Sequence, residues 1–184
     1  ISSEVGDFGQ RFLIEDFGQH QIRNKMGFRY KIYDQSKAYF ITSTVVGWID
    51  VFSQKPCRDV IIESLKYCQK EKGLIIFAFV IMKNHIHLVA QASENNLSDI
   101  IRDFKKYTSR MITTILISSE ETRPKWMVEQ FSQYGAQCRN NETYQFWKQD
   151  NHPIELYSNK FFKQKIKYIH NNPIKAGIVE NPED

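Results

Sequence analysis

The chain has 184 residues, 41% of them hydrophobic and 14% aromatic, with a formal net charge of +4. This length supports one full hydrophobic core, and we expect one domain at 37–184 preceded by an N-terminal extension at 1–36. No apolar segment is long enough to span a bilayer and no secretion signal is seen, so cytoplasmic residence is expected. The odd number and wide spacing of the three cysteines argue against a disulfide framework.

The first predicted elements are a strand and a helix. Residues 38–46 are rich in β-branched and aromatic side chains, which favour a strand. Residues 58–72 carry apolar side chains at helical spacing and are followed by Gly73, a residue that commonly ends helices.

Two histidines begin the second arm of a predicted hairpin. The apolar run 74–82 has the composition of a largely buried strand, and Lys83-Asn84 would form the turn into the next one. His85 and His87 are two residues apart in that next strand, so both project from one face. This geometry suits a metal ion, although a His-x-His pair alone is more often explained by packing or surface exposure.

A second long helix is predicted at 97–117, because its apolar residues form one stripe. Met111 and Ile115 are assigned to the last turns of that stripe. Basic side chains lie outside it, namely Arg102, Lys105, Lys106 and Arg110.

The last third of the chain is predicted to end in a helix. The segment 120–142 is polar and no element is predicted there, whereas 144–149 could form another strand. The closing helix should run from a cap at 158–159 to about Asn171, where Pro173 stops it.

The closing helix would present a phenol and a carboxamide on one face. Tyr168 and Asn172 are four residues apart, with Lys165 one turn earlier on the same side. His170 points about 200° away from Tyr168 and is interpreted as a packed or capping residue. Helical geometry alone does not decide between Asn171 and Asn172, since a residue before proline tends to leave helical geometry.

These motifs together resemble a known family. His-hydrophobic-His after Lys-Asn, followed about eighty residues later by Tyr-Ile-His-Asn-Asn-Pro-Ile-Lys-Ala-Gly, resembles the single-tyrosine HUH transposases of the REP-associated, insertion-sequence type. The resemblance covers about 38–179, including 104–109 and 146–152, and leaves the N-terminal arm outside. It implies an α+β fold, with a ferredoxin-like (RRM-like) antiparallel sheet and helices packed on one face.

The resemblance also implies roles for four residues. His85 and His87 would be metal ligands, Tyr168 the nucleophile, and Asn172 the polar residue that completes the metal site. Many relatives have glutamine at this last position, and asparagine has a shorter reach, so a bridging water is an alternative to direct ligation. Two imidazoles with an amide oxygen and open positions would accept Mg²⁺ or Mn²⁺, although nitrogen ligands also favour zinc or nickel.

The activity implied is metal-dependent cleavage and rejoining of single-stranded DNA near hairpins, through a 5′-phosphotyrosine intermediate. A phenol with a reference pKa of about 10 is a poor nucleophile at neutral pH, so the metal would have to polarise the phosphodiester. The family pairs as homodimers, and a bacterial protein acting at the nucleoid is expected. Two alternatives stay open: a replication initiator or relaxase-like nickase, and a non-catalytic RRM-like nucleic-acid-binding domain.

Basic and aromatic side chains supply candidate DNA contacts. The candidates for phosphate binding are Arg102, Lys105, Lys106, Arg110, Lys163 and Lys167. Candidate base-stacking residues are Tyr107, Trp126 and Trp147. Taken singly, lysines are more often plain surface and aromatic residues more often core.

Overall fold

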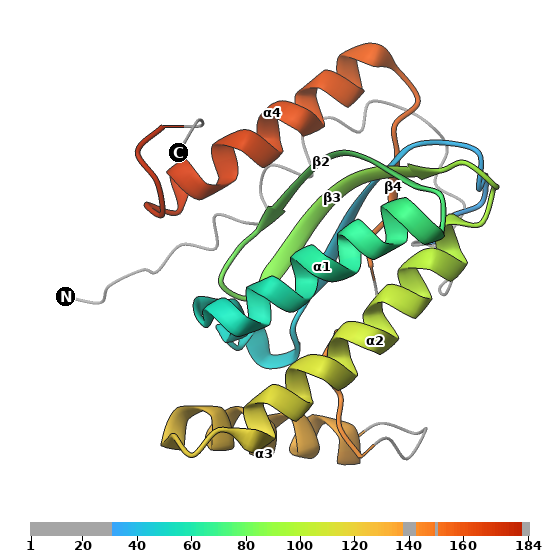
Figure 1. Cartoon of the computed structure of the whole chain (residues 1–184). Helices are drawn as coiled ribbons and strands as arrows, with labels where there is room; N and C mark the ends of the chain where they lie inside the picture. The colour runs from blue at the N-terminus through green and yellow to red at the C-terminus, as the bar shows by residue number, and fades with distance from the viewer. Residues whose placement is uncertain (1–30, 138–142, 150, 182–184) are drawn as a thin grey trace.

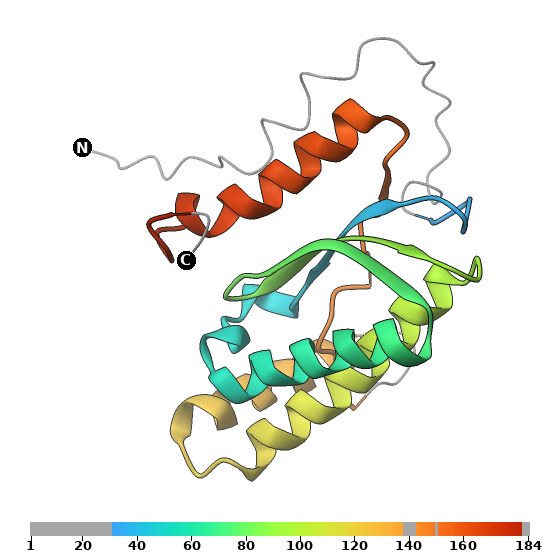
Figure 2. The ribbon, with the colours of Figure 1, turned by 45° about the horizontal axis from the view of Figure 1, so that its top comes forward.

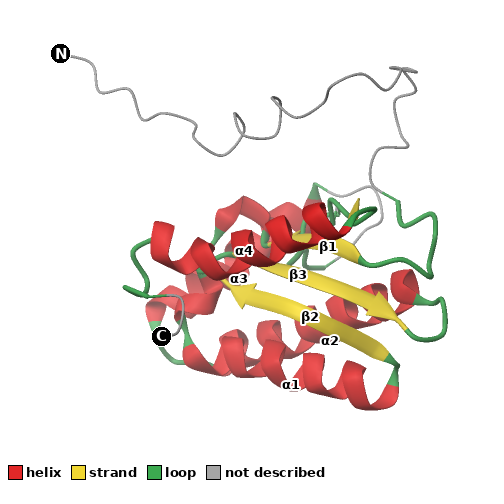
Figure 3. Cartoon of the chain, turned by 90° about the horizontal axis from the view of Figure 1, so that it is seen from above, coloured by secondary structure: helices red, strands yellow, loops and turns green. Residues whose placement is uncertain are grey.

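The computed structural model describes residues 31–137, 143–149 and 151–181. The elements follow one another as β1 (Tyr39–Thr44), the short 3₁₀ turns η2 (Val46–Trp48) and η3 (Val51–Ser53), α1 (Lys55–Glu71), β2 (Leu74–Ile81), β3 (His85–Ala92), α2 (Leu97–Ser118), α3 (Thr122–Ala136), β4 (Ile154–Glu155) and α4 (Asn159–Lys175) (Figure 1). The strands form one antiparallel sheet in the order β2-β3-β1-β4, and Figure 3 shows β2, β3 and β1 side by side. The predicted α+β class with an antiparallel sheet is confirmed.

The sheet separates two hydrophobic layers. On one face, Ile41 of β1 and Leu88 of β3 join the main core with α1 and α2. On the other face, Phe40 and Val89 pack against Ile169 of α4. Figure 2 shows α4 above the sheet and α1, α2 and α3 below it. The expectation of helices on one face therefore holds for α1 and α2, whereas α4 covers the opposite face.

The predicted strand, hairpin and first two helices are all present, with small differences. Helix α1 begins at Lys55, three residues earlier than expected, because Pro56 is suited to the first helical turn. In the last turns of α2 the buried positions are Ile112 and Leu116, one residue later than the predicted Met111 and Ile115. Helix α2 is in contact with α3, an element that the sequence did not predict.

The segment between α2 and α4 differs most from the prediction. Residues 122–136 form α3, which buries Met127 and Phe131 on one side. The fourth strand is β4 at Ile154–Glu155, whereas the predicted strand at 144–149 makes only an isolated bridge between Trp147 and Val45. Residues 138–142 and 150 lie outside the described part of the chain.

Helix α4 continues through Pro173 to Lys175, so the predicted stop at this proline is wrong. The termination signal is instead Gly177, which lies two residues after the last helical residue and adopts a left-handed conformation with φ of 64°. The Gly177 N–H donates to Ile174 O and the Ile178 N–H to Pro173 O, which is the Schellman pattern of helix termination. Proline is tolerated here because it lacks only one donor in a helix whose packing against the sheet is already established upstream.

The two cysteines in the described part of the chain belong to the hydrophobic core. Cys57 and Cys68 are buried free thiols on α1, and burial raises the pKa of Cys57 to about 11. Cys138 lies outside the described residues. No helix among the described residues has the length and apolarity needed to cross a membrane.

Candidate metal and tyrosine site

Strand β3 presents His85 and His87 on the sheet face that α4 covers. Ile86 and Leu88 alternate with them and are buried in the main core on the other face. The two imidazole centroids are 4.8 Å apart, and antiparallel pairing puts Thr42 of β1 directly opposite His87. The predicted alternation of this strand is therefore confirmed.

The side chain of Asn84 fixes the tautomer of His85. Its Nδ2 donates to the backbone oxygen of Trp48 at 3.1 Å and to Oδ1 of Asp50 at 2.8 Å. The amide oxygen therefore faces His85 Nδ1 at 2.8 Å and can only accept, so that this ring nitrogen carries the proton. The Nε2 lone pair of His85 is left available to bind a cation.

His87 is the more buried of the two imidazoles, with 6% of its surface exposed. Its Nδ1 lies 2.9 Å from Thr42 Oγ1, and its ring stacks on Phe40 at a centroid distance of 5.1 Å. Burial, together with the charges of His85 and Lys165, lowers the pKa of His87 to about 3. Burial also lowers the pKa of His85. Both imidazoles are thus neutral at physiological pH, which is the form that binds metals.

Helix α4 places Tyr168 against the second histidine. The phenol ring lies 5.3 Å from His87 and 5.7 Å from Phe40 between centroids, and 43% of Tyr168 is exposed. Lys165, one turn earlier, holds its ammonium 4.9 Å from the Phe40 centroid and 5.7 Å from that of Tyr168. Burial lowers the pKa of Lys165. A phenol, an ammonium and two imidazoles from distant parts of one chain therefore meet on this face.

Asn172 follows Tyr168 by one regular turn of α4, because the helix continues through Pro173. Among the described residues, no group of three or more His, Cys, Asp and Glu side chains is suitably placed for a metal ion. A cation bound here would have two neutral imidazoles as protein donors, with amide, water or substrate oxygens to complete its coordination. Such a set fits a divalent cation whose charge an anionic phosphate would balance.

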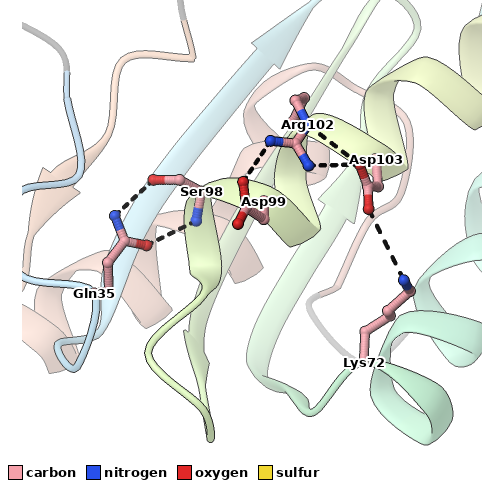
Figure 4. A network of polar contacts seen from close by, with 6 residues as sticks. All are labelled: Gln35, Lys72, Ser98, Asp99, Arg102 and Asp103. Atoms are coloured by element: carbon pink, nitrogen blue, oxygen red, sulfur yellow. Dashed lines mark hydrogen bonds and ion pairs between the residues drawn. The ribbon is translucent and has the colours of Figure 1, made fainter.

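The six basic residues predicted to bind DNA divide between two helices: Arg102, Lys105, Lys106 and Arg110 on α2, and Lys163 and Lys167 on α4. Helix α2 lies across the sheet from the histidines (Figure 2). Arg102 is bonded to the carboxylates of Asp99 and Asp103, which Figure 4 shows beside the Gln35–Ser98 contact. The ammonium of Lys105 donates to the backbone oxygen of Lys148 at 2.8 Å. Both cations thus have partners within the protein.

The two lysines on α4 lie on the helix that carries Tyr168. Lys163 and Lys167 are exposed, and they line a groove with Phe162, Ile166 and His170. His170 is exposed, so the prediction of a packed residue at this position is wrong.

Some residues of this site were not singled out from the sequence. Thr42 and Phe40 lie on β1, and their contact with His87 depends on strand register, which local sequence does not reveal. Asn84 was recognised only as part of the turn, and Trp48 was not considered. The exposed indole of Trp48 lies 6.0 Å from His85 between ring centroids.

Comparisons with known proteins found one family model and similar solved structures. Residues 48–134 match the family model for IS200-like transposases; this segment contains both histidines and ends before α4. A solved REP-associated tyrosine transposase bound to a REP hairpin is similar at 16% identity, with a TM-score of 0.52 over 83% of this chain and 76% of that one. A crystal structure of a candidate transposase from Deinococcus radiodurans shares 14% identity over 82% of this chain and 97% of that one, with a TM-score of 0.44.

No curated protein matches the chain. The first solved structure shows a shared fold, and the family model covers the strand that carries the paired histidines. Over residues 48–134 the chain is therefore similar to the IS200-like transposases.

Proposed function

We propose that this protein is a transposase that cleaves and rejoins single-stranded DNA beside a hairpin, through a covalent 5′-phosphotyrosine intermediate that requires Mg²⁺ or Mn²⁺. The observation that carries the proposal is the contact between Tyr168 and His87, whose ring centroids are 5.3 Å apart within one chain. A partly exposed phenol beside two neutral imidazoles has the parts that such chemistry needs. The similar structure with a bound REP hairpin supports a hairpin substrate.

The proposed reaction exchanges one phosphoester for another. The Oη of Tyr168 attacks the scissile phosphorus, the new O–P bond forms, and the bond to the 3′ oxygen breaks. The phenolic proton passes to solvent, which reaches the exposed side of Tyr168, and the departing 3′ oxygen takes up a proton. The DNA downstream of the cut stays linked through its 5′ phosphate, and this ester permits rejoining without a nucleotide cofactor.

Protein side chains around Tyr168 would hold and balance the phosphate. His85 and His87 would hold the cation through ring nitrogens, with Asn172 as the amide donor. When bound, the cation polarises the phosphodiester and stabilises the charge that develops during attack. Lys165, whose ammonium lies near the Tyr168 ring, would attract the same phosphate.

The remaining candidates are assigned by position. Lys163 and Lys167 would contact the DNA backbone from the helix that carries the nucleophile, so their effect should be salt-sensitive. The four basic residues of α2 would reach only DNA that extends around the sheet. We further propose a bacterial cytoplasmic homodimer, in which each protomer uses its own tyrosine and histidines.

The direct test of the chemistry is covalent capture of DNA. A pool of hairpins with randomised single-stranded flanks is labelled at the 3′ end, because the downstream fragment stays on the protein. The parent protein with Mn²⁺ should give a labelled band that resists denaturant, whereas Tyr168→Phe should give none while binding the pool with nearly unchanged affinity. Equal capture by Tyr168→Phe would contradict the nucleophile, and hairpin binding without capture by the parent would favour the non-catalytic alternative.

A further inference from the structure

An exposed tryptophan next to the histidines is held in an unusual backbone conformation. Gly47 and Trp48 have φ of 61° and 55°, and positive φ is a marked outlier for a bulky side chain. A Cβ on Gly47 would lie 2.9 Å from the ring of Tyr134, so the turn is also closely packed. Strained residues of this kind persist where the surroundings fix them, and they cluster at ligand sites.

The strained turn is connected to the paired histidines by hydrogen bonds. The backbone oxygen of Trp48 accepts from Asn84 Nδ2 at 3.1 Å, and Asn84 Oδ1 accepts from His85 Nδ1 at 2.8 Å. The indole itself stays 56% exposed, although its centroid is only 6.0 Å from that of His85. One amide side chain therefore connects the backbone of Trp48 to the imidazole of His85.

A lysine ammonium lies over the same indole. Lys148 Nζ is 4.3 Å from the centroid of the Trp48 ring. Both backbone polar groups of Lys148 are hydrogen-bonded. Its N–H donates to Thr44 O at 2.8 Å, and its carbonyl oxygen accepts from Lys105 Nζ at 2.8 Å. The cation and the aromatic surface are thus presented together at the edge of the histidine site.

We propose that Trp48 and Lys148 form a nucleotide subsite, in which a base of single-stranded DNA stacks on the indole and Lys148 contacts the adjoining phosphate. This inference rests on the proposed function and adds to it the position of a flanking nucleotide. Base stacking on an aromatic side chain, with a cation for the backbone, is the general mode of single-strand binding. It is sequence-tolerant, because every base has a flat face.

The other aromatic candidates do not share this combination of exposure and position. Trp147 is buried, and its indole N–H donates to Thr108 Oγ1 at 3.2 Å, so it belongs to the core. Tyr107 and Trp126 are exposed but lie on α2 and α3, on the side of the sheet opposite the histidines. Trp126, with 48% exposure, therefore serves as a matched control for Trp48.

The test removes the indole and the base separately and in combination. The probes are DNA hairpins of G·C pairs with a short oligothymidine flank on the 5′ or the 3′ side, in which an abasic site replaces each flanking nucleotide in turn. The protein variants are Trp48→Gly, which suits the positive φ and so removes the indole without added backbone strain, Trp48→Tyr and Trp126→Ala. Affinity is measured by fluorescence anisotropy.

The parent should lose about tenfold in affinity at one abasic position. Trp48→Gly should bind the intact probe about tenfold more weakly and show no further loss at that position, whereas Trp48→Tyr should recover part of the affinity. Trp126→Ala should behave like the parent. Two results would contradict the subsite. In the first, Trp48→Gly loses affinity at the same abasic position as the parent. In the second, the affinity lost through Trp48→Gly adds to the affinity lost through an abasic site at every position.

The same samples distinguish this inference from the proposed function. A parent that binds the probes but forms no covalent adduct would contradict the cleavage chemistry. In that case the affinities for the abasic probes would still test the subsite. A parent that binds neither hairpin would overturn both. Lys148→Met should weaken binding and reduce its dependence on salt, and an unchanged salt dependence would remove Lys148 from the subsite.

Discussion

At the scale of single residues, the proposed chemistry requires imidazoles that stay neutral. His87 is enclosed by Phe40, Thr42 and Tyr168, and its protonated form is disfavoured by burial before any other cause. Asn84 settles the tautomer of His85 because its amide nitrogen is already committed to two acceptors. The protein therefore offers lone pairs to a cation without first having to release protons.

This burial predicts a pH dependence of stability in the metal-free protein. The pKa of His87 is about 3 when folded and about 6.5 in an unfolded chain. Between these values the unfolded state binds more protons, so the free energy of unfolding falls as pH falls, by up to about 1.4 kcal/mol per pH unit from His87. When the pH is lowered from 6.5 to 5, the free energy of unfolding of His87→Gln should fall by roughly 2 kcal/mol less than that of the parent.

Urea unfolding in the presence of chelator would measure this difference. His170→Gln is the matched control, since His170 is exposed on α4, and it should keep the pH dependence of the parent. A His87→Gln variant whose stability falls with pH as steeply as that of the parent would contradict the buried, neutral state of His87.

At the scale of elements, sequence periodicity predicted the strand and the helix that carry the site residues, but not that these two elements pack together. His85, His87 and Tyr168 could each be assigned to a face of a strand or helix from spacing alone. That α4 returns to the histidine side of the sheet follows from packing of Phe40, Val89 and Ile169, which joins distant segments. Contacts of this kind carry no local signal in the sequence.

There are also physical reasons why some elements were not predicted from the sequence. Helix α3 buries Pro124, Met127, Phe131 and Gly135. Only Met127 and Phe131 are large apolar side chains, so its apolar stripe is weak in the sequence. Strand β4 has two residues, too few for an alternating pattern. The end of α4 was misplaced because Pro173 was given more weight than Gly177, whose left-handed conformation ends the helix.

Strand β2 is the element that supports the proposed homodimer. It is an edge strand of the described sheet, and Ile75, Phe77 and Phe79 are 41%, 44% and 43% exposed. Exposed apolar edges favour pairing with another strand. Sedimentation velocity should therefore show a dimer for the parent and a monomer for the double variant Ile75→Lys with Phe79→Lys.

A control for that experiment is Ile117→Lys, which adds charge at an exposed apolar residue on α2 and should remain dimeric. A parent that sediments as a monomer at all concentrations would contradict the dimer. Unchanged association of the double variant would instead exclude β2 as the interface.

At the scale of the whole molecule, the two faces of the sheet differ in what they carry. The face with α1 and α2 holds most of the buried side chains, and the face with α4 carries the candidate chemistry. Because Tyr168 already contacts His87 in the same chain, each protomer has a complete set of the proposed residues. A dimer would then contain two independent sites.

One measurement tests this account most directly: covalent capture of the 3′-labelled hairpin pool by two inactive variants, alone and mixed. The variants are Tyr168→Phe and the pair His85→Ala with His87→Ala, compared with the parent in Mn²⁺ on a denaturing gel. The account predicts capture by the parent only, and none by either variant or by their mixture. Capture by the histidine variant alone would contradict the role of the imidazoles, and capture restored by mixing would contradict a site built within one chain.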